Sequence, residues 1–144
     1  MAKILSICGD DRLRYTRQIL LCRTGAEVVS SRADSGLELI RQQRFDLLVM
    51  GYSIPVDIAT QFSGMLRHRW PDSKVLYVSF PLHSERSRIV TDRIADRIVD
   101  WTEGPDVFQG TAQELLLLVE QQTSRQPMQL PIAFSASRSA PNSD

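Results

Sequence analysis

The residues in this chain that could do chemistry stand directly after short apolar segments. Asp10 and Asp11 follow the apolar segment 3–8, and Ser79 stands near the end of the apolar segment 74–80. Carboxylate oxygens are the ligands that Mg²⁺ prefers, and a hydroxyl can donate a hydrogen bond to an anionic group. These three residues are therefore the first candidates for a small-ligand site, with Asp10 and Asp11 as weak candidates for metal ligation.

No other motif in the sequence supports catalysis or a bound cofactor. There is no G-x-G-x-x-G after the first apolar segment and no Walker pattern, so a nucleotide or flavin site is not indicated. His68 and His83 have no partner at ligand spacing and are expected to be solvated surface residues. Cys8 and Cys22 also lack metal-type spacing, and we expect both to be buried, reduced thiols, which is typical of a cytoplasmic protein.

Composition predicts one soluble globular domain. The chain has 144 residues, of which 42% are hydrophobic and 24% are charged. Seventeen basic residues balance seventeen acidic ones, so no overall field favours nucleic acid or an anionic membrane as a partner. No apolar run approaches the roughly 18 residues that a membrane span needs.

Short apolar segments alternate with helical patterns along the first 122 residues. Strands are predicted at 3–8, 26–32, 46–50, 74–80 and 97–101. Helices are predicted at 13–22, at 33–44, after Asp57 up to about 69, at 83–95 and at 111–122. This alternation predicts an α/β fold of the flavodoxin-like, doubly wound type, with a five-stranded parallel sheet and helices on both faces.

Two local features are predicted for the first and the last helix. The apolar face of the first helix is assigned to Leu13, Thr16, Ile19 and Leu20. The last helix is predicted to begin with a capping box formed by Thr111 and Glu114.

The segment 123–144 is rich in serine and proline without periodicity. It is expected to be a disordered tail that follows the domain 1–122. Within it, the apolar stretch 127–134 could order against a partner.

The pattern resembles that of bacterial response-regulator receiver domains, the CheY-like family, from about Lys3 to Gln122. The likeness is carried by "KILSICGDD", by "FDLLVMGYSIP", by "RWPDSKVLYVS" and by the Leu-rich final helix. The spacing also agrees, with 28 positions from Gly51 to Ser79 and 21 from Ser79 to Asp100. In this family an aspartate that ends the third strand accepts a phosphoryl group. An acidic pair after the first strand helps to hold Mg²⁺, and a Ser/Thr and a Lys bind the phosphoryl oxygens.

Most of that set is absent from this sequence. Gly51 stands at the phosphoacceptor position, and Cys8 and Gly9 stand where the acidic pair is expected. Asp100 replaces the lysine and so reverses its charge, whereas Ser79 keeps the hydroxyl. The resemblance therefore implies a degenerate pseudo-receiver without Mg²⁺ or another cofactor.

The neighbouring carboxylates allow two interpretations. Asp10 and Asp11 lie one or two residues beyond the acidic-pair positions, so a small register error would restore a metal pair, but both also suit the start of the first helix. Asp57 is expected to cap the third helix. Asp46 begins its strand and is expected at the opposite edge of the sheet.

The leading functional hypothesis is a stand-alone, non-enzymatic receiver-like domain in two-component (phosphorelay) signal transduction that binds a protein partner without phosphate control. The family commonly uses residues near the fourth helix, fifth strand and fifth helix, which here gives Ile89, Arg93, Arg97 and Trp101 as the candidate interaction surface. Trp101 suits either an exposed contact or a filling for the vacated acidic pocket. Homodimerisation is left open. The alternative is a phosphotransfer or small-ligand domain that uses Asp10 or Asp11 near Ser79.

Overall fold

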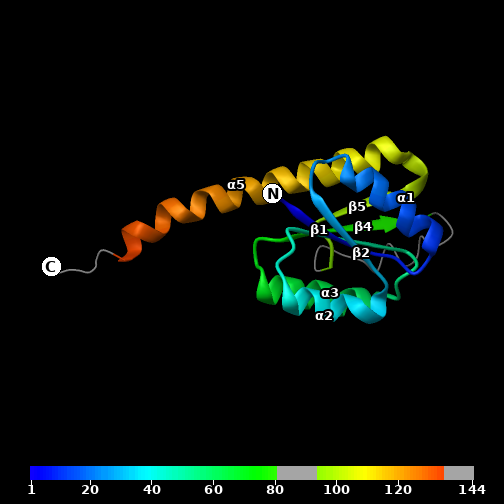
Figure 1. Cartoon of the computed structure of the whole chain (residues 1–144), viewed down its shortest axis with the longest axis horizontal. Coiled ribbons are helices and arrows are strands. Elements are labelled where there is room, and N and C mark those ends of the chain that lie inside the picture. Colours follow the sequence, from blue (N-terminus) through cyan, green and yellow to red (C-terminus); the bar gives the residue numbers. More distant parts are fainter. Residues whose placement is uncertain (81–93, 135–144) are drawn as a thin grey trace.

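The fold is known from a computed structural model, which describes residues 1–80 and 94–134 and the side chains of 1–80 and 94–122. The helix predicted at 83–95 falls almost entirely outside these residues, as do Ile89, Arg93 and His83. The described part contains five strands and the helices that connect them, coloured along the chain in Figure 1.

A single parallel sheet forms the centre of the molecule. Its strands are β1 (Lys3–Ile7), β2 (Glu27–Ser31), β3 (Leu47–Gly51), β4 (Lys74–Ser79) and β5 (Arg97–Asp100). They pair in the order β2-β1-β3-β4-β5, and every pair is parallel. The predicted flavodoxin-like fold class is thereby confirmed.

Helices cover both faces of the sheet. The helices are α1 (Asp11–Cys22), α2 (Ala33–Gln42), α3 (Val56–Arg69) and α5 (Pro105–Phe134), with the short 3₁₀ helix η2 (Trp101–Glu103) after β5. Figure 1 shows α1 and α5 on one face and α2 and α3 on the other. Because both faces are covered, the strands are apolar almost throughout, as in β3, where every residue is buried.

Two apolar clusters fill the space between the layers. The cluster under α2 and α3 includes Phe45, Phe62 and Tyr77, and the cluster under α1 and α5 includes Leu21, Val49 and Phe108. The chain passes from β1 outward to β2 and then returns to β3 on the other side of β1. The loops after β1 and β3 therefore meet at the carboxyl edge of the sheet, which is where ligands bind in folds of this kind.

The last helix differs from its predicted bounds at both ends. It begins at Pro105, so Thr111 lies inside it and its Oγ1 donates to the carbonyl of Val107 at 2.8 Å. The predicted capping box at Thr111 is therefore wrong. The capping box of this region is formed instead by Asp100 and Glu103 at the start of η2.

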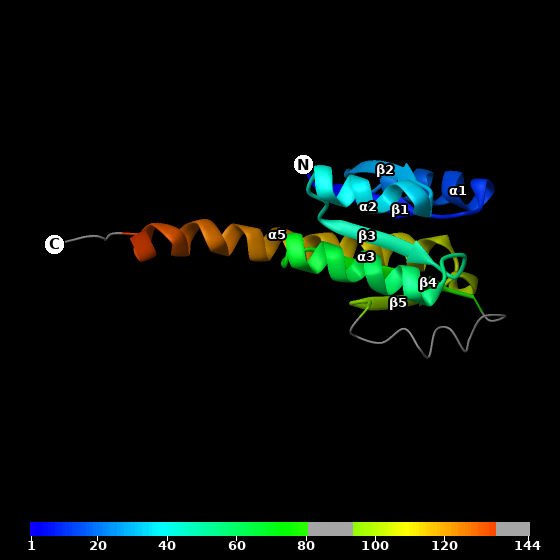
Figure 2. The same ribbon diagram turned by 90° about the horizontal axis from the view of Figure 1, so that it is seen from below.

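At its other end α5 continues to Phe134, twelve residues past Gln122, and Figures 1 and 2 both show it projecting beyond the sheet. Disorder was predicted there because the segment 123–144 is rich in serine and proline without periodicity; Pro127 and Pro131 lie within the observed helix. A proline interrupts the hydrogen bonding of a helix locally, however, and the Gln, Arg and Met residues around these prolines are good helix formers. Residues 135–144 lie outside the described part of the chain.

The orientation of α1 also differs from the prediction. Thr16 and Ile19 are exposed, and the buried positions are Arg17, Leu20 and Leu21. The predicted end of this helix is confirmed, because Gly25 has a φ of 87° and its N–H donates to the carbonyl of Cys22. Cys8 is buried as expected, but Cys22 is exposed, so the expectation that both thiols are buried is wrong for Cys22.

The start of α3 also differs from the prediction. Asp57 lies inside the first turn of α3, after the N-cap residue Pro55, so it does not cap the helix as predicted. Among the described residues, no helix has both the length and the apolar character that crossing a membrane requires.

Candidate functional site

The structure brings the predicted site positions together at the carboxyl edge of the sheet. The N–H of Gly9 donates to Ser53 Oγ at 3.4 Å, which joins the loop after β1 to the loop after β3. The N–H of Tyr52 donates to the carbonyl of Val78 at 2.9 Å, and Ser79 is paired in register with Asp100. The positions that correspond to a receiver phosphorylation site thus form one region.

The centre of this region is filled by a side chain that sequence analysis did not select. Arg17 of α1 is 1% exposed, and its guanidinium group lies against Gly51. A Cβ atom built on Gly51 would be 2.7 Å from Arg17 Nη1 and 3.1 Å from Nη2. These distances are too short for unstrained contact, so the guanidinium group occupies the space into which a side chain at position 51 would extend.

Two aromatic rings contact the guanidinium group. The Cζ atom of Arg17 lies 5.1 Å from the ring centre of Trp101 and 5.8 Å from that of Tyr52, which are cation–π distances. Trp101 packs edge-on against Phe108, with ring centres 5.4 Å apart. Trp101 is half-buried and contacts both Arg17 and Phe108, so the two interpretations of Trp101 both stay predictions.

Arg17 has no ordinary hydrogen-bond partner within the described residues. Its Nε, Nη1 and Nη2 atoms are all buried and make no hydrogen bond there. Burial lowers the pKa of Arg17, and Cys8, Tyr52 and Asp10 oppose that shift through their charges. Burial also raises the pKa of Tyr52, an effect that Arg17 partly offsets. A buried cation with this few partners is unusual in a folded protein.

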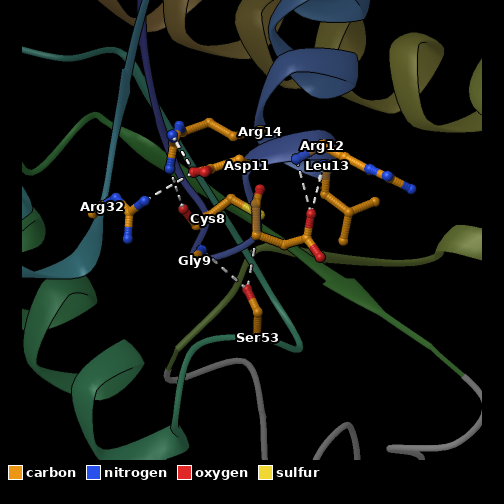
Figure 3. A network of polar contacts seen from close by, with 9 residues as sticks. Cys8, Gly9, Asp11, Arg12, Leu13, Arg14, Arg32 and Ser53 are labelled. Carbon is orange, nitrogen blue, oxygen red and sulfur yellow. Dashed lines mark hydrogen bonds and ion pairs between the residues drawn. The ribbon is translucent and has the colours of Figure 1, made fainter.

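The carboxylates after β1 are engaged at the start of α1. Asp10 is the N-cap residue, and its Oδ1 accepts from the N–H groups of Arg12 and Leu13 at 2.9 and 3.1 Å. Asp11 forms ion pairs with Arg14 and Arg32, as Figure 3 shows. The structure thus supports the capping interpretation for Asp10 and an ion-pair role for Asp11.

These residues do not fit a magnesium site. Gly51 and Gly9 have no side-chain oxygen, Cys8 offers sulfur, and both neighbouring carboxylates have other partners. Within the described part of the chain no cluster of three or more His, Cys, Asp or Glu side chains is arranged to hold a metal ion. The cationic side chain nearest to Gly51 at this edge is that of Arg17.

Asp100 and Ser79 have local structural partners. Asp100 Oδ1 accepts from the N–H and the hydroxyl of Thr102 at 2.9 and 2.6 Å, and Asp100 N donates to Glu103 at 3.1 Å. Hydrogen bonds from the side chain and the backbone of Thr102 lower the pKa of Asp100. The Ser79 hydroxyl is buried and donates to the carbonyl of Val99 at 3.5 Å. Both residues therefore stabilise the end of β5.

Other predicted residues lie away from this site. Asp46 stands at the amino edge of the sheet as predicted, where its Oδ2 accepts from the N–H of Lys3 at 2.9 Å. His68 is exposed, as expected. Of the candidate interaction residues that the structure describes, Arg97 is exposed and forms an ion pair with Glu114 of α5 at 2.9 Å.

Arg17 was missed although the sequence holds a signal for it. It lies four residues after Leu13 and four before Leu21, so it shares a helix face with apolar residues. A cation on the apolar face of a helix, opposite a glycine at the end of a buried strand, is the combination that identifies this site.

Comparison with solved structures identifies the fold as that of response-regulator receiver domains. A CheY-like receiver domain protein from Methanospirillum hungatei JF-1 has a TM-score of 0.70 at 20% identity, over 85% of this chain and 98% of that one. The response regulator TrrA from Thermotoga maritima, in complex with Mg²⁺ and BeF, has a TM-score of 0.66 at 18% identity, over 80% of this chain and 99% of that one.

A larger protein contains the same fold as one part. NtrX from Brucella abortus, in complex with ADP, has a TM-score of 0.72 at 17% identity, over 89% of this chain but only 30% of that one. The sequence matches no protein-family model, and no curated protein is detectably similar to it. The chain is therefore a protein of the CheY-like receiver fold, with an arginine in the space where a side chain at position 51 would lie.

Proposed function

We propose that this protein is a degenerate receiver domain that binds a protein partner in bacterial two-component signalling and is not controlled by phosphorylation or by Mg²⁺. The observation that carries the proposal is the position of the Arg17 guanidinium group, 2.7 Å from the place of a Cβ on Gly51. The receiver fold supports the signalling role, and the loss of the acceptor supports the absence of phosphate control.

The chemistry of phosphoryl transfer explains why these substitutions act together. Transfer to a carboxylate needs the nucleophile itself and a cation that neutralises the developing charge on the phosphoryl oxygens. At this edge Gly51 supplies no nucleophile, and Asp100 places a negative charge where the family has a lysine. The buried cation, Arg17, is in the place of the acceptor and not beside it.

The proposed interaction surface consists of β5 and α5. Ile98 of β5 is 42% exposed, and Leu117 of α5 is 50% exposed. Because Val99 packs under α5, Ile98 lies on the other face of the sheet, so the two residues sample separate parts of this surface. Arg97 and Glu114 add a charge pair that joins the two elements. Exposed apolar side chains close to charged groups are characteristic of protein-binding surfaces. Trp101 packs against Arg17 and Phe108, so it connects the former phosphorylation region to the start of this surface.

Incubation with acetyl phosphate and Mg²⁺, followed by intact-mass measurement, tests the absence of phosphorylation. We expect no phosphoryl adduct on this protein, while a receiver domain that keeps its acceptor aspartate becomes phosphorylated under the same conditions. A phosphoryl adduct that hydroxylamine removes would contradict the proposal, because that lability identifies an acyl phosphate on a carboxylate.

Partner capture tests the interaction role. Ile98→Asp and Leu117→Asp should each abolish co-purification of a partner that the wild-type protein retains, because a charge is placed on an exposed apolar contact. Gln61→Asp, which places the same charge at an exposed position of α3, away from β5 and α5, serves as the matched control. Retention of the partner by both aspartate variants would place the interaction surface elsewhere.

A further inference from the structure

We propose that this chain forms a homodimer in which the projecting end of α5 of each copy, residues 123–134, packs into a hollow at the amino edge of the other copy's sheet. The two contacts are equivalent, because a two-fold axis relates the copies. The proposal goes beyond the proposed signalling function and does not depend on it, since it concerns two copies of the same chain.

The first support is the projecting end of α5 itself. Figures 1 and 2 show it leaving the body of the molecule in two views at right angles. The segment is rich in apolar residues, and Arg125 is its one charged residue. Pro127 and Pro131 lower its intrinsic helix stability, so a helix here depends mainly on packing against another apolar surface. The projecting end therefore requires an apolar partner.

The second support is a hollow beside the part of α5 from which this end extends. Its volume is about 420 Å³, which is within the range of ordinary binding pockets. It lies between the start of β1, the turn after α1 and the side of α5, and its apolar lining includes Ala2, Ala26, Leu116 and Leu117. Leu117 is 50% exposed. This amino-edge hollow, at the opposite edge of the sheet from Gly51, thus offers an apolar surface that the single chain leaves uncovered.

The dimensions of α5 allow two copies to exchange their projecting ends. Residues 123–134 extend about 18 Å as a helix, and the part of α5 that lines the hollow, from Gln113 to Glu120, extends about 10 Å. A two-fold axis near Gln122 lays the projecting end of each copy antiparallel along this part of the other copy. The end cannot enter the hollow of its own chain, because α5 is one continuous helix that leads away from it. A second copy therefore supplies the contact that one chain cannot make.

The charges of the two surfaces are complementary. Asp46 and Glu120 line the amino-edge hollow, and none of the described residues that line it is a lysine or an arginine. Asp46 is paired with Arg44, but Glu120 forms no ion pair with any described residue. The projecting end brings one basic residue, Arg125, and no acidic one. Docking of this end brings a positive charge to a hollow that contains an unpaired carboxylate, which favours it over an acidic peptide.

Sedimentation equilibrium of the purified full chain, between about 1 and 100 μM, tests the dimer without any other protein present. We expect the mass to rise from 16.3 kDa toward twice that value as the concentration increases. Leu117→Asp in the hollow and Leu130→Asp in the projecting end should each raise the dissociation constant about tenfold or more, because each places a charge in an apolar contact. Gln61→Asp, at an exposed position of α3, should leave it unchanged. Circular dichroism checks that each variant is folded.

A mixture of the two aspartate variants tests the reciprocal arrangement. The Leu130→Asp copy keeps an intact hollow and the Leu117→Asp copy keeps an intact end, so one of the two contacts forms again and the mixture should dimerise more strongly than either variant alone. A mixture no stronger than the separate variants would overturn the proposal, because parallel pairing of two α5 helices leaves no contact intact in it. Aspartate variants that dimerise like the wild type would also overturn it. A wild-type chain that stays monomeric throughout the concentration range would do the same and would leave the hollow to a different partner.

Discussion

Two charged side chains, Asp46 at the amino edge of the sheet and Arg17 at the carboxyl edge, differ in the partners that they contact. At the amino edge, Asp46 Oδ2 accepts from the N–H of Lys3 at 2.9 Å, and its Oδ1 pairs with Arg44 at 3.4 Å. At the carboxyl edge, Arg17 is more deeply buried, but within the described residues it has ring contacts in place of hydrogen bonds. Asp46 thus has the partners expected of a structural carboxylate, whereas Arg17 has no oxygen acceptor among the described residues.

This contrast indicates where the fold is under a constraint other than stability. Buried charges that serve only structure are normally paired, and replacing an unfavourable one by an apolar residue often stabilises a protein. In folds of this class the carboxyl edge is also the functional edge. At this edge a buried charged side chain, Arg17, lies where an apolar filling would be more stable.

The largest expected effect comes from removing the charge of Arg17. Arg17→Met should raise the free energy of unfolding by about 1–4 kcal/mol, because the cost of burying an unpaired cation disappears. Urea unfolding followed by circular dichroism measures this change. A destabilisation of similar size would show that the charge is fully compensated and would remove the contrast between the two edges.

The amino edge should respond in the opposite direction. Asp46→Ala should lower the free energy of unfolding by about 2 kcal/mol, since it removes the acceptor of the Lys3 N–H and the partner of Arg44. The same unfolding measurement applies, with Glu120→Ala as an exposed control. An Asp46→Ala protein as stable as the wild type would mean that this carboxylate is not a structural element.

A smaller effect is expected at the ring that covers Arg17. Trp101→Leu should lower the free energy of unfolding by about 1–2 kcal/mol, because it removes the cation–π contact and the edge-on contact with Phe108. In the Arg17→Met background the loss should be smaller by roughly the cation–π share. An identical loss in both backgrounds would contradict a direct contact between Trp101 and the guanidinium group.

The smallest effect concerns the pH response of Asp100. Its pKa is lowered in the folded state, so its stabilising effect is present above the unfolded pKa of about 3.9 and is lost as pH falls through the lower folded value. Thr102→Val removes the hydroxyl that makes the larger contribution and should move the pKa of Asp100 upward. An NMR titration of the carboxyl carbon measures the pKa, and an unchanged value would contradict the assignment.

The overall fold could be predicted from sequence because it depends on patterns that repeat along the chain. Buried parallel strands require apolar runs such as 74–80, and Gly25 marks the end of a helix through its positive φ. The corrected details concern the ends and the rotation of single helices. Thr111 and Glu114 have the spacing of a capping box, but α5 already begins at Pro105.

Only part of the site could be predicted, because strand positions can be assigned from sequence but the rotation of a helix about its axis cannot. The positions of Gly51, Cys8, Gly9 and Asp100 could be predicted, because the strands fix which residues stand at the edge. The side chain that lies against Gly51 comes from a helix, and its burial depends on the rotation of α1 about its axis. Assigning Thr16 and Ile19 to the buried face hid Arg17, and only the packed structure shows that its guanidinium group lies against Gly51.

A double-mutant cycle between Gly51 and Arg17 tests the central claim, that the guanidinium group fills the space of a side chain at position 51. Gly51→Ala should lower the free energy of unfolding by about 1–3 kcal/mol in the wild type, since its Cβ meets Nη1 at 2.7 Å. Gly64→Ala, with open space around it, should be neutral or stabilising. In the Arg17→Met background the cost of Gly51→Ala should largely disappear, which gives a coupling of about 1–2 kcal/mol. An equal cost of Gly51→Ala in both backgrounds would contradict the account.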